Sequence, residues 1–324
     1  GTNCVGLGVE MLGVLVEREF DVHEEHAVGR HHEREVGAAA NRVLDRLTRE
    51  AEHPEERTKS VIPTPWPTLT RMLRGGCRIG EVVVIAGRPG TGKTAAAMQM
   101  VAEASNYGGV LVVSLEMRTD ALVEREMARA GGVDHTRIAE LTLSQADWRN
   151  LVMAVNALEQ APVYVMDTPA LTIGKIASAV RQKIAKLAAQ GVVVRTVMVD
   201  YLQLITAEAQ RGRVEETQLL ADISKGLVSL AKLAGVAIIA VAQMNRNVES
   251  RGETARPRMS DLRGSGQIEQ DAAAIIFTAR PEDPELAEIH QDWRDLVVAK
   301  ARHGVTGEVG CVWIGERMTL EERR

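Results

Sequence analysis

The chain has 324 residues, of which 45% are hydrophobic and 26% charged, with a formal net charge of -5 at pH 7. This length suits one large domain or two modest ones. The negative charge excludes a broadly basic surface, so any nucleic acid must bind through a local patch. No apolar run reaches the roughly 18–20 residues that a membrane-spanning helix needs.

Cysteine usage and the N-terminal composition predict a protein of a reducing compartment. Cys4, Cys77 and Cys311 are far apart and form neither a disulfide framework nor a zinc-binding spacing. Residues 1–20 lack the basic start of a secretory signal. We therefore expect a cytoplasmic protein with reduced thiols and no membrane association.

Residues 1–60 differ in composition from the rest and are predicted to form an N-terminal segment. Residues 17–35 are dense in charge and hold four of the eight histidines. Their spacing matches no familiar metal site, so a solvated polar segment is the favoured interpretation and a metal site the alternative. From Glu35 to Glu52 apolar residues recur every three or four positions, which predicts an amphipathic helix. That helix must pack on the next domain or on another subunit, and residues 55–60 are predicted to be a linker.

Residues 61–324 show strands alternating with helices. The predicted strands are 81–86, 110–114, 163–166, 192–199, 236–242, 272–278, 296–299 and 308–314. The predicted helices are 94–105, 119–130, 147–159, 173–190 and 215–234. This alternation predicts one α/β domain with a largely parallel sheet. The last two strands have no long helix between them, which indicates an antiparallel edge.

One segment has the complete pattern of a phosphate-binding loop: Gly87-Arg88-Pro89-Gly90-Thr91-Gly92-Lys93-Thr94. The glycines let successive backbone N–H groups point at phosphate oxygens, and the following helix adds its positive end. The lysine would neutralise the β and γ phosphates, and the threonine hydroxyl would coordinate Mg²⁺. The predicted strand before it and helix after it favour a nucleoside triphosphatase over a plain glycine-rich turn.

Three polar residues end predicted strands, where the crevice of an open α/β sheet lies. Asp200 follows an apolar strand and is expected to hold the metal ion or its water. Glu116 follows the second strand and is either the group that activates water or a charge partner of the next helix. Gln243 is either a sensor of the γ phosphate or an ordinary polar strand end.

Several further motifs resemble the motor domain of DnaB-type replicative helicases. They are Ser114-Leu115-Glu116-Met117, Asp200-Tyr201-Leu202-Gln203-Leu204, Ala242-Gln243-Met244-Asn245-Arg246, the segment from Ser260 to Asp271, and Ala299-Lys300-Ala301-Arg302-His303-Gly304. The resemblance runs in order from about Ile62 to Leu320. It implies a RecA-like core in a hexameric ring around single-stranded DNA, with ATP bound between subunits, encoded by a bacterium or a phage.

The resemblance also implies roles for the site residues. Glu116 would be the water-activating base, and Gln243 would couple the γ phosphate to movement. Lys300 and Arg302 would reach into the neighbouring subunit's site, where such a finger is worth roughly 10³–10⁵ in rate. Without the resemblance, these two residues would be read as ordinary surface charge.

Arg263, Gly264 and Gly266 correspond to the family's DNA-contacting loop, in which glycines permit close approach to phosphates. The family usually carries an acidic residue at position 264, so the resemblance does not carry over the contact or subunit bridge of that residue. The segment from Ala207 to Glu216, with Arg211 and Arg213, is either a second channel-facing loop or a surface loop. The predicted helix 35–52 resembles a linker helix, whereas the N-terminal collar domain and its primase contact are not carried over.

The leading hypothesis is an ATP-driven helicase that moves 5′ to 3′ on single-stranded DNA. The first alternative is a recombination or repair ATPase of the same superfamily, which binds single-stranded DNA without processive unwinding. The second is a ring component that binds ATP without turnover. The expected cofactors are ATP and Mg²⁺, and a primase or a helicase loader is a further partner to consider.

Overall fold

The computed structural model describes residues 27–323, except 168–170, 207–215, 246–250, 253 and 263–264. The chain divides into two compact units, residues 1–56 and 57–324, and each is described by itself. None of the described helices is long and apolar enough to cross a membrane.

The first unit contains one long helix, α2 (Ala27–Glu52). The prediction that this helix starts at Glu35 is wrong, because it already begins at Ala27. Residues 27–34 contain no proline and several good helix formers, so they extend the helix. The residues expected to form a linker after the helix include the short 3₁₀ helix η1 (Pro54–Lys59), and the division between the two units falls within it. Most of the histidine-rich segment that raised the question of a metal site lies outside the described residues.

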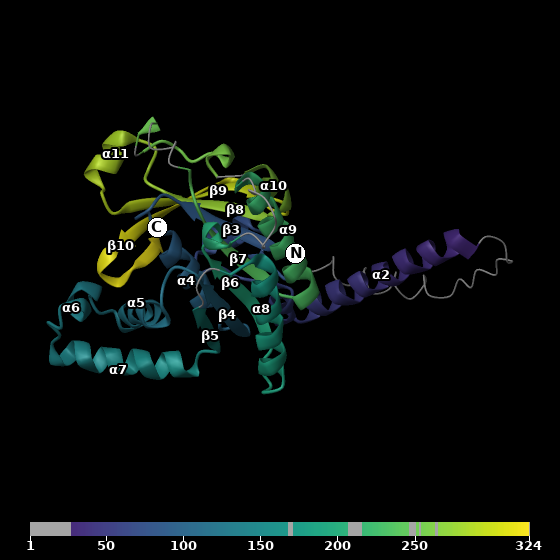
Figure 1. The fold of residues 1–324 in the computed structure, drawn as a ribbon, viewed down its shortest axis with the longest axis horizontal. Helices are drawn as coiled ribbons and strands as arrows, with labels where there is room; N and C mark the ends of the chain where they lie inside the picture. Colours follow the sequence, from purple (N-terminus) through teal and green to yellow (C-terminus); the bar gives the residue numbers. More distant parts are fainter. Residues whose placement is uncertain are drawn as a thin grey trace, which may run out of the picture. The chain divides into compact units, whose positions relative to one another are not determined.

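The second unit is built on a nine-stranded sheet with the order β11-β10-β9-β8-β3-β7-β6-β4-β5 (Figure 1). The strands from β8 to β5 in that order are parallel, and β9, β10 and β11 extend the sheet in antiparallel fashion. The strands are β3 (Val82–Gly87), β4 (Gly109–Ser114), β5 (Val163–Asp167), β6 (Val194–Asp200), β7 (Ala237–Gln243), β8 (Ala274–Ala279), β9 (Trp293–Ala301), β10 (Gly307–Ile314) and β11 (Thr319–Glu322). A separate pair is formed by β1 (Val61–Ile62) and β2 (Cys77–Arg78).

Helices cover both faces of the sheet. The helices of this unit are α3 (Pro67–Met72), α4 (Lys93–Ala104), α5 (Thr119–Gly131), α6 (His135–Ala139), α7 (Gln145–Gln160), α8 (Ile173–Ala188), α9 (Glu216–Ala234), α10 (Ser265–Asp271) and α11 (Pro284–Ile289), with 3₁₀ helices η2 (Leu202–Leu204), η4 (Met259–Asp261) and η5 (Gly315–Arg317). Figure 1 shows α4 on one side of the sheet and α8 and α9 on the other. One core cluster joins the sheet to α8, α9 and α10, and a second joins it to α3, α4 and α5.

Local sequence explains these elements. All six residues of β3, of β4 and of β8 are buried, as expected for parallel strands that are covered on both faces. Helix α7 begins with a capping box in which Ser144 and Asp147 satisfy each other's backbone N–H groups. Thr172 caps α8, and Asp283 followed by Pro284 begins α11.

The predicted fold class, a mostly parallel α/β sheet with an antiparallel C-terminal edge, is confirmed. The short elements α3, α6, α10, α11 and β11 were not predicted, because four to seven residues show too little periodicity. Strand β9 is longer than predicted because the apolar pattern leaves out the charged residues Arg294 and Asp295, which the strand includes and buries. An ion pair of 3.0 Å between Arg323 Nη2 and Asp295 Oδ1 compensates one of these charges.

Candidate nucleotide site

The predicted phosphate loop joins β3 to α4. β3 ends at Gly87 and α4 begins at Lys93, so Lys93 and Thr94 lie in the first helical turn, whose backbone N–H groups are free for an anion. Gly90 and Gly92 have φ angles of 78° and 87°, a region that residues with a Cβ rarely adopt. The loop therefore has the backbone shape that an anion site needs.

Threonine hydroxyls tie the loop to the neighbouring strand β8. Thr91 Oγ1 donates to the carbonyl oxygen of Arg88 at 2.8 Å and lies 2.8 Å from Thr278 Oγ1. A Cβ atom added to Gly87 would lie 2.2 Å from Thr278 Oγ1 and 2.5 Å from Thr91 Oγ1. The start of the loop therefore has no room for a side chain.

We expect Gly87→Ala to lower the free energy of unfolding by about 1–3 kcal/mol, the usual effect of overpacking, and to weaken ATP binding because the loop must shift. Thermal unfolding and nucleotide titration measure the two effects. Gly266→Ala is the control for stability, since a Cβ there meets nothing within 4 Å. Wild-type stability and ATP affinity in Gly87→Ala would contradict the crowding seen at this position.

The carboxylate of Asp200 is the most unusual group at this edge of the sheet. It ends β6 and is fully buried, yet neither of its oxygens has a hydrogen-bond partner. Burial, and after it the negative charge of Glu116, raise its pKa to about 6, although Thr94, Lys93 and Arg125 act in the opposite direction. Residues from β6, α4, α5 and the loop after β4 thus surround one buried carboxylate.

Glu116 is held close to Asp200 by the ends of two adjacent strands. Ser114 and Asp200 are paired residues of β4 and β6, and the backbone N–H of Leu115 donates to the Asp200 carbonyl oxygen at 2.7 Å. Ser114 Oγ donates to the Met117 carbonyl oxygen at 2.6 Å and closes a tight turn. Glu116 lies in that turn with its side chain exposed.

Gln243 lies beside the start of the phosphate loop. It ends β7 and pairs with Gly87 of β3, so the two residues are about 5 Å apart, the usual spacing of neighbouring strands. Gln203, for which the sequence predicts no role, holds the Gln243 backbone with its side chain. Gln203 Nε2 donates to the Gln243 carbonyl oxygen at 3.0 Å, and the Gln243 N–H donates to Gln203 Oε1 at 3.1 Å.

Lys300 and Arg302 lie near the amino ends of the parallel strands, whereas the phosphate loop follows the carboxyl end of β3. Because β9 is antiparallel to β8, its final residues are level with the start of β8. Arg302 lies 3.8 Å from Glu81, the residue before β3, whereas the phosphate loop follows the other end of that strand. The separation is roughly 20 Å along β3, which is further than an arginine side chain extends.

Within this chain, Lys300 and Arg302 instead bind the carboxyl end of α10. Lys300 Nζ donates to the carbonyl oxygens of Glu269 and Gln270, and Arg302 Nη2 donates to those of Gln270 and Asp271. Cations are stabilising at the end of a helix, where carbonyl groups lack partners.

Comparison with known proteins identifies the family. Residues 61–322 match the profile of the DnaB-like helicase C-terminal domain. The chain belongs to this family. The family predicted from the motifs is therefore confirmed.

The relatives are replicative helicases. The chain is 34% identical over 258 residues to the replicative DNA helicase DnaB of Geobacillus stearothermophilus, covering 79% of this chain and 55% of that protein. It thus spans about half the length of the curated relatives it matches. A solved ATPase domain is similar with a TM-score of 0.75 and 31% identity over 87% of this chain and 99% of that one. A solved DnaB-like replicative helicase, described with its interactions with primase, is similar with a TM-score of 0.74 and 28% identity over 99% of this chain and 72% of that one.

The residues predicted to contact DNA are only partly described. Arg263 and Gly264 lie outside the described residues, as do residues 207–215 with Arg211 and Arg213. Gly266 is exposed in the first turn of α10. Arg88 of the phosphate loop donates to the carbonyl oxygen of Gly252 at 2.8 Å, a contact that sequence reasoning could not anticipate.

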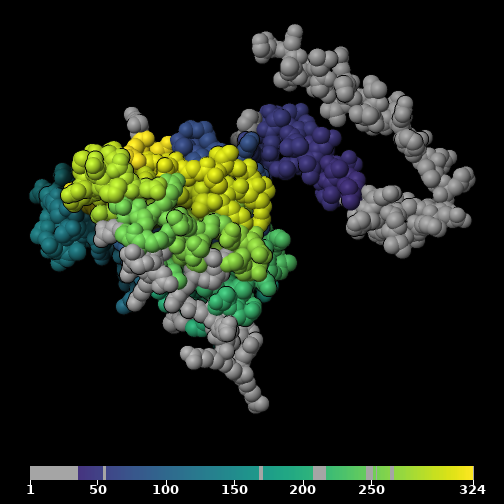
Figure 2. All heavy atoms as spheres, turned by 90° about the horizontal axis from the view of Figure 1, so that it is seen from above, coloured from purple at the N-terminus to yellow at the C-terminus, as the bar shows by residue number. Residues whose placement is uncertain are grey.

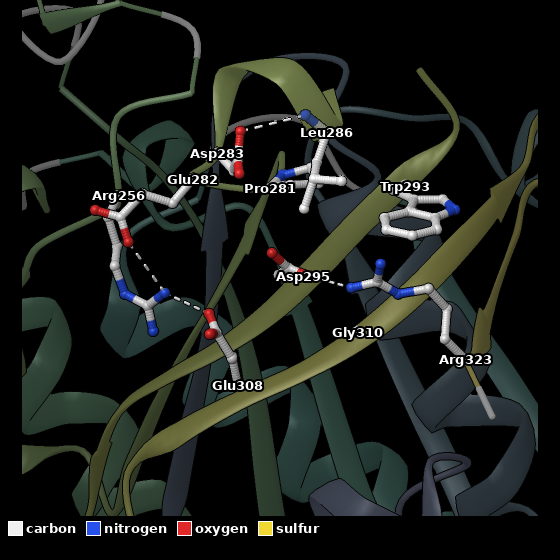
Figure 3. A pocket seen from close by; sticks show the side chains of 10 residues that line it. All are labelled: Arg256, Pro281, Glu282, Asp283, Leu286, Trp293, Asp295, Glu308, Gly310 and Arg323. Carbon is white, nitrogen blue, oxygen red and sulfur yellow. Dashed lines mark hydrogen bonds and ion pairs between the residues drawn. The ribbon is translucent and has the colours of Figure 1, made fainter. Parts of the chain in front are cut away.

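Away from the phosphate loop, a hollow of about 550 Å³ lies over β9 and β10, beside α11 (Figure 3). The C-terminal part of the chain that forms it, in light green and yellow, makes up much of the face shown in Figure 2. Its charged groups pair with each other, Arg256 with Glu308 and Arg323 with Asp295. In the described part of the chain, the buried carboxylate oxygens without a partner are those of Asp200, which favours the phosphate loop over this hollow as the candidate nucleotide site.

Proposed function

We propose that this chain is the motor of an ATP-dependent replicative DNA helicase, which moves 5′ to 3′ on single-stranded DNA as a hexameric ring and unwinds duplex DNA. The observation that carries the proposal is the convergence of Lys93, Thr94, Asp200 and Glu116 at one edge of the sheet. Two neighbouring carboxylates beside an anion-binding loop are unfavourable by themselves. Such an arrangement lowers the stability of the free protein and suits the binding of a metal ion and phosphates.

The residues present fit a hydrated Mg²⁺ ion. The described residues contain no cluster of three or more His, Cys, Asp or Glu that could enclose a metal ion. Mg²⁺ bound with ATP does not need such a cluster, because it keeps several waters and takes phosphate oxygens as ligands. The Thr94 hydroxyl would be a direct ligand, and the unpartnered oxygens of Asp200 would bind the ion or its water. Bound Mg²⁺ neutralises charge on the β and γ phosphates.

The remaining residues of the site have separate roles in hydrolysis. The backbone of residues 87–92 would bind the phosphates, and Lys93 would neutralise their charge. Glu116, exposed at the end of β4, would orient and deprotonate the attacking water. Gln243, next to Gly87, would detect the γ phosphate.

The position of Lys300 and Arg302 supports a site that is shared between subunits. They lie too far from the phosphate loop of their own chain to reach it. A hexameric ring would place them against the nucleotide of the neighbouring copy, where Arg302 would stabilise the charge of the transferring phosphoryl group.

Exposed apolar side chains support contact between copies. Val36, Val43, Leu44 and Leu47 of α2 are each about half exposed or more. On the second unit, α7 exposes Trp148, Val152 and Met153. Surfaces of this kind mark protein interfaces, and we propose that residues 1–60 carry a linker helix that packs on an adjacent motor domain, residues 61–324.

DNA contact is assigned to the residues that precede and begin α10. Arg263 supplies a positive charge, and Gly264 and Gly266 permit close approach to the phosphates. Arg263 directly follows Leu262, which pairs with Met244 next to Gln243. This neighbourhood supports a DNA site coupled to the nucleotide site in a protein of negative net charge.

A forked DNA duplex with one labelled strand tests the proposed function. We expect strand release that requires ATP and Mg²⁺ and a fork with a free 5′ tail. Lys93→Ala should lower the rate by about 10²-fold or more, since an electrostatic donor to the transition state is lost. The measurements are the fraction of released strand and the mass of the assembly with ATP, which should be that of a hexamer.

Other outcomes of the fork experiment identify the alternatives. ATP hydrolysis that DNA stimulates without strand release would indicate a recombination or repair ATPase. Binding of ATP without turnover would indicate a non-catalytic ring component. Co-purification with a primase or a helicase loader tests these further partners separately.

A further inference from the structure

The side chain of Gln203 forms a two-point bond with the backbone at the end of β7. Its amide nitrogen donates to the carbonyl oxygen of Gln243, and its amide oxygen accepts from the N–H of the same residue. Only a primary amide side chain supplies a donor and an acceptor side by side in this way. The bond therefore fixes the position of Gln243 through its backbone and leaves its side chain to other partners.

Buried neighbours in the chain anchor Gln203 in the core. It lies in η2, between Leu202 and Ile205, which are 1% and 2% exposed. η2 starts two residues after Asp200, and, of the two residues between Asp200 and Gln203, Leu202 is buried, so a shift of this strand end would be transmitted to Gln203 over a short distance. Packed cores of this kind transmit displacement because they are nearly incompressible.

The same backbone continues from Gln243 to the proposed DNA site. Met244 pairs with Leu262, and the N–H of Asn245 donates to the Asp261 carbonyl oxygen at 2.8 Å. Met244 and Leu262 are 5% and 2% exposed and belong to the core cluster that contains Leu202. The end of β7 is thus joined to η2 on one side and to the segment before Arg263 on the other.

We propose that Gln203 is a positioning residue that couples the nucleotide site to the DNA site through the backbone of Gln243. It holds the γ-phosphate sensor in register with the metal-binding strand end, so that loss of the γ phosphate displaces the end of β7 and, with it, the segment that leads to Arg263. This inference rests on the proposed function, since it assumes that ATP and single-stranded DNA are the two ligands.

Two substitutions separate this role from general stability. Gln203→Met keeps a side chain of similar size and removes both hydrogen bonds. Gln203→Glu keeps the acceptor for the Gln243 N–H and loses the donor to its carbonyl oxygen. Gln218→Met is the matched control, because Gln218 is exposed and its side chain donates to Asp222 of the same helix.

The experiment measures kcat and KM for ATP with and without saturating single-stranded DNA, together with thermal unfolding. We expect Gln203→Met to lower the ratio of stimulated to basal kcat by about fivefold or more, the size of a typical coupling between sites. Gln203→Glu should also lower this ratio, because a carboxylate oxygen would then face the Gln243 carbonyl oxygen, and Gln218→Met should not change it.

An unchanged ratio in Gln203→Met, or in Gln203→Glu if the first variant does not fold, would overturn the inference. Equal losses of basal and stimulated kcat would also overturn it, because they indicate a role in stability alone. A wild-type protein whose turnover does not respond to DNA would instead contradict the proposed function itself.

Discussion

Arg302→Ala is expected to lower ATP turnover by about 10³–10⁵-fold while nucleotide affinity stays close to that of the wild type. The reason is that Arg302 lies near the amino ends of the parallel strands, whereas its own phosphate loop follows the carboxyl end of β3. Its guanidinium would act on the neighbouring subunit's transition state and would add little to ground-state binding. Steady-state ATPase rates and binding of a fluorescent ATP analogue measure the two quantities.

A mixing experiment tests whether the site is shared. Equal amounts of Arg302→Ala and Lys93→Ala subunits, each inactive alone, should regain up to about a quarter of wild-type turnover if the interfaces act independently. Arg302→Lys is the control for the loss of charge at the end of α10, since it keeps a cation near Gln270 and Asp271. No recovery in mixed rings, or full activity of Arg302→Ala, would show that Arg302 has only the structural role seen within one chain.

Asp200→Asn is expected to abolish Mg²⁺-dependent hydrolysis and, without nucleotide and metal, to raise stability at neutral pH relative to the wild type. In the folded protein burial raises the Asp200 pKa from 3.8 to about 6. The folded state then binds more protons than the unfolded state in this interval, so the wild type loses stability as pH rises from about 4 to 6. A shift of this size corresponds to about 2–3 kcal/mol.

Urea unfolding of both proteins in EDTA, at pH 4.5 and at pH 7.5, checks this expectation. The stability of Asp200→Asn relative to the wild type should increase between the two pH values, because asparagine does not titrate. Added Mg²⁺ and ADP should then stabilise the wild type more than the variant, since ligands that bind the folded state increase its stability. A relative stability that does not depend on pH would mean that Asp200 is not held in an unfavourable charged state.

The sequence predicted most directly the part of the candidate site that consecutive residues form. The loop from Gly87 to Thr94 is recognisable because one short segment contains the glycines, the lysine and the threonine together. Asp200 and Gln243 were expected at the same crevice because each ends an apolar strand, and parallel strands end at one edge. Gln203 was not predicted to hold Gln243, since 40 residues separate the two partners and nothing local marks the pair.

The sequence by itself determined the phosphate loop, the α/β class and the family, because these depend on local spacing and on the period of apolar residues. The tertiary structure decided which groups face one another: that Asp200 is buried without partners beside Glu116, and that Gln203 holds the end of β7. It also decided that Arg302 lies near the start of β3, whereas its own phosphate loop follows the end of that strand. Strand order and register fix these distances, and both arise from packing between segments far apart in the chain.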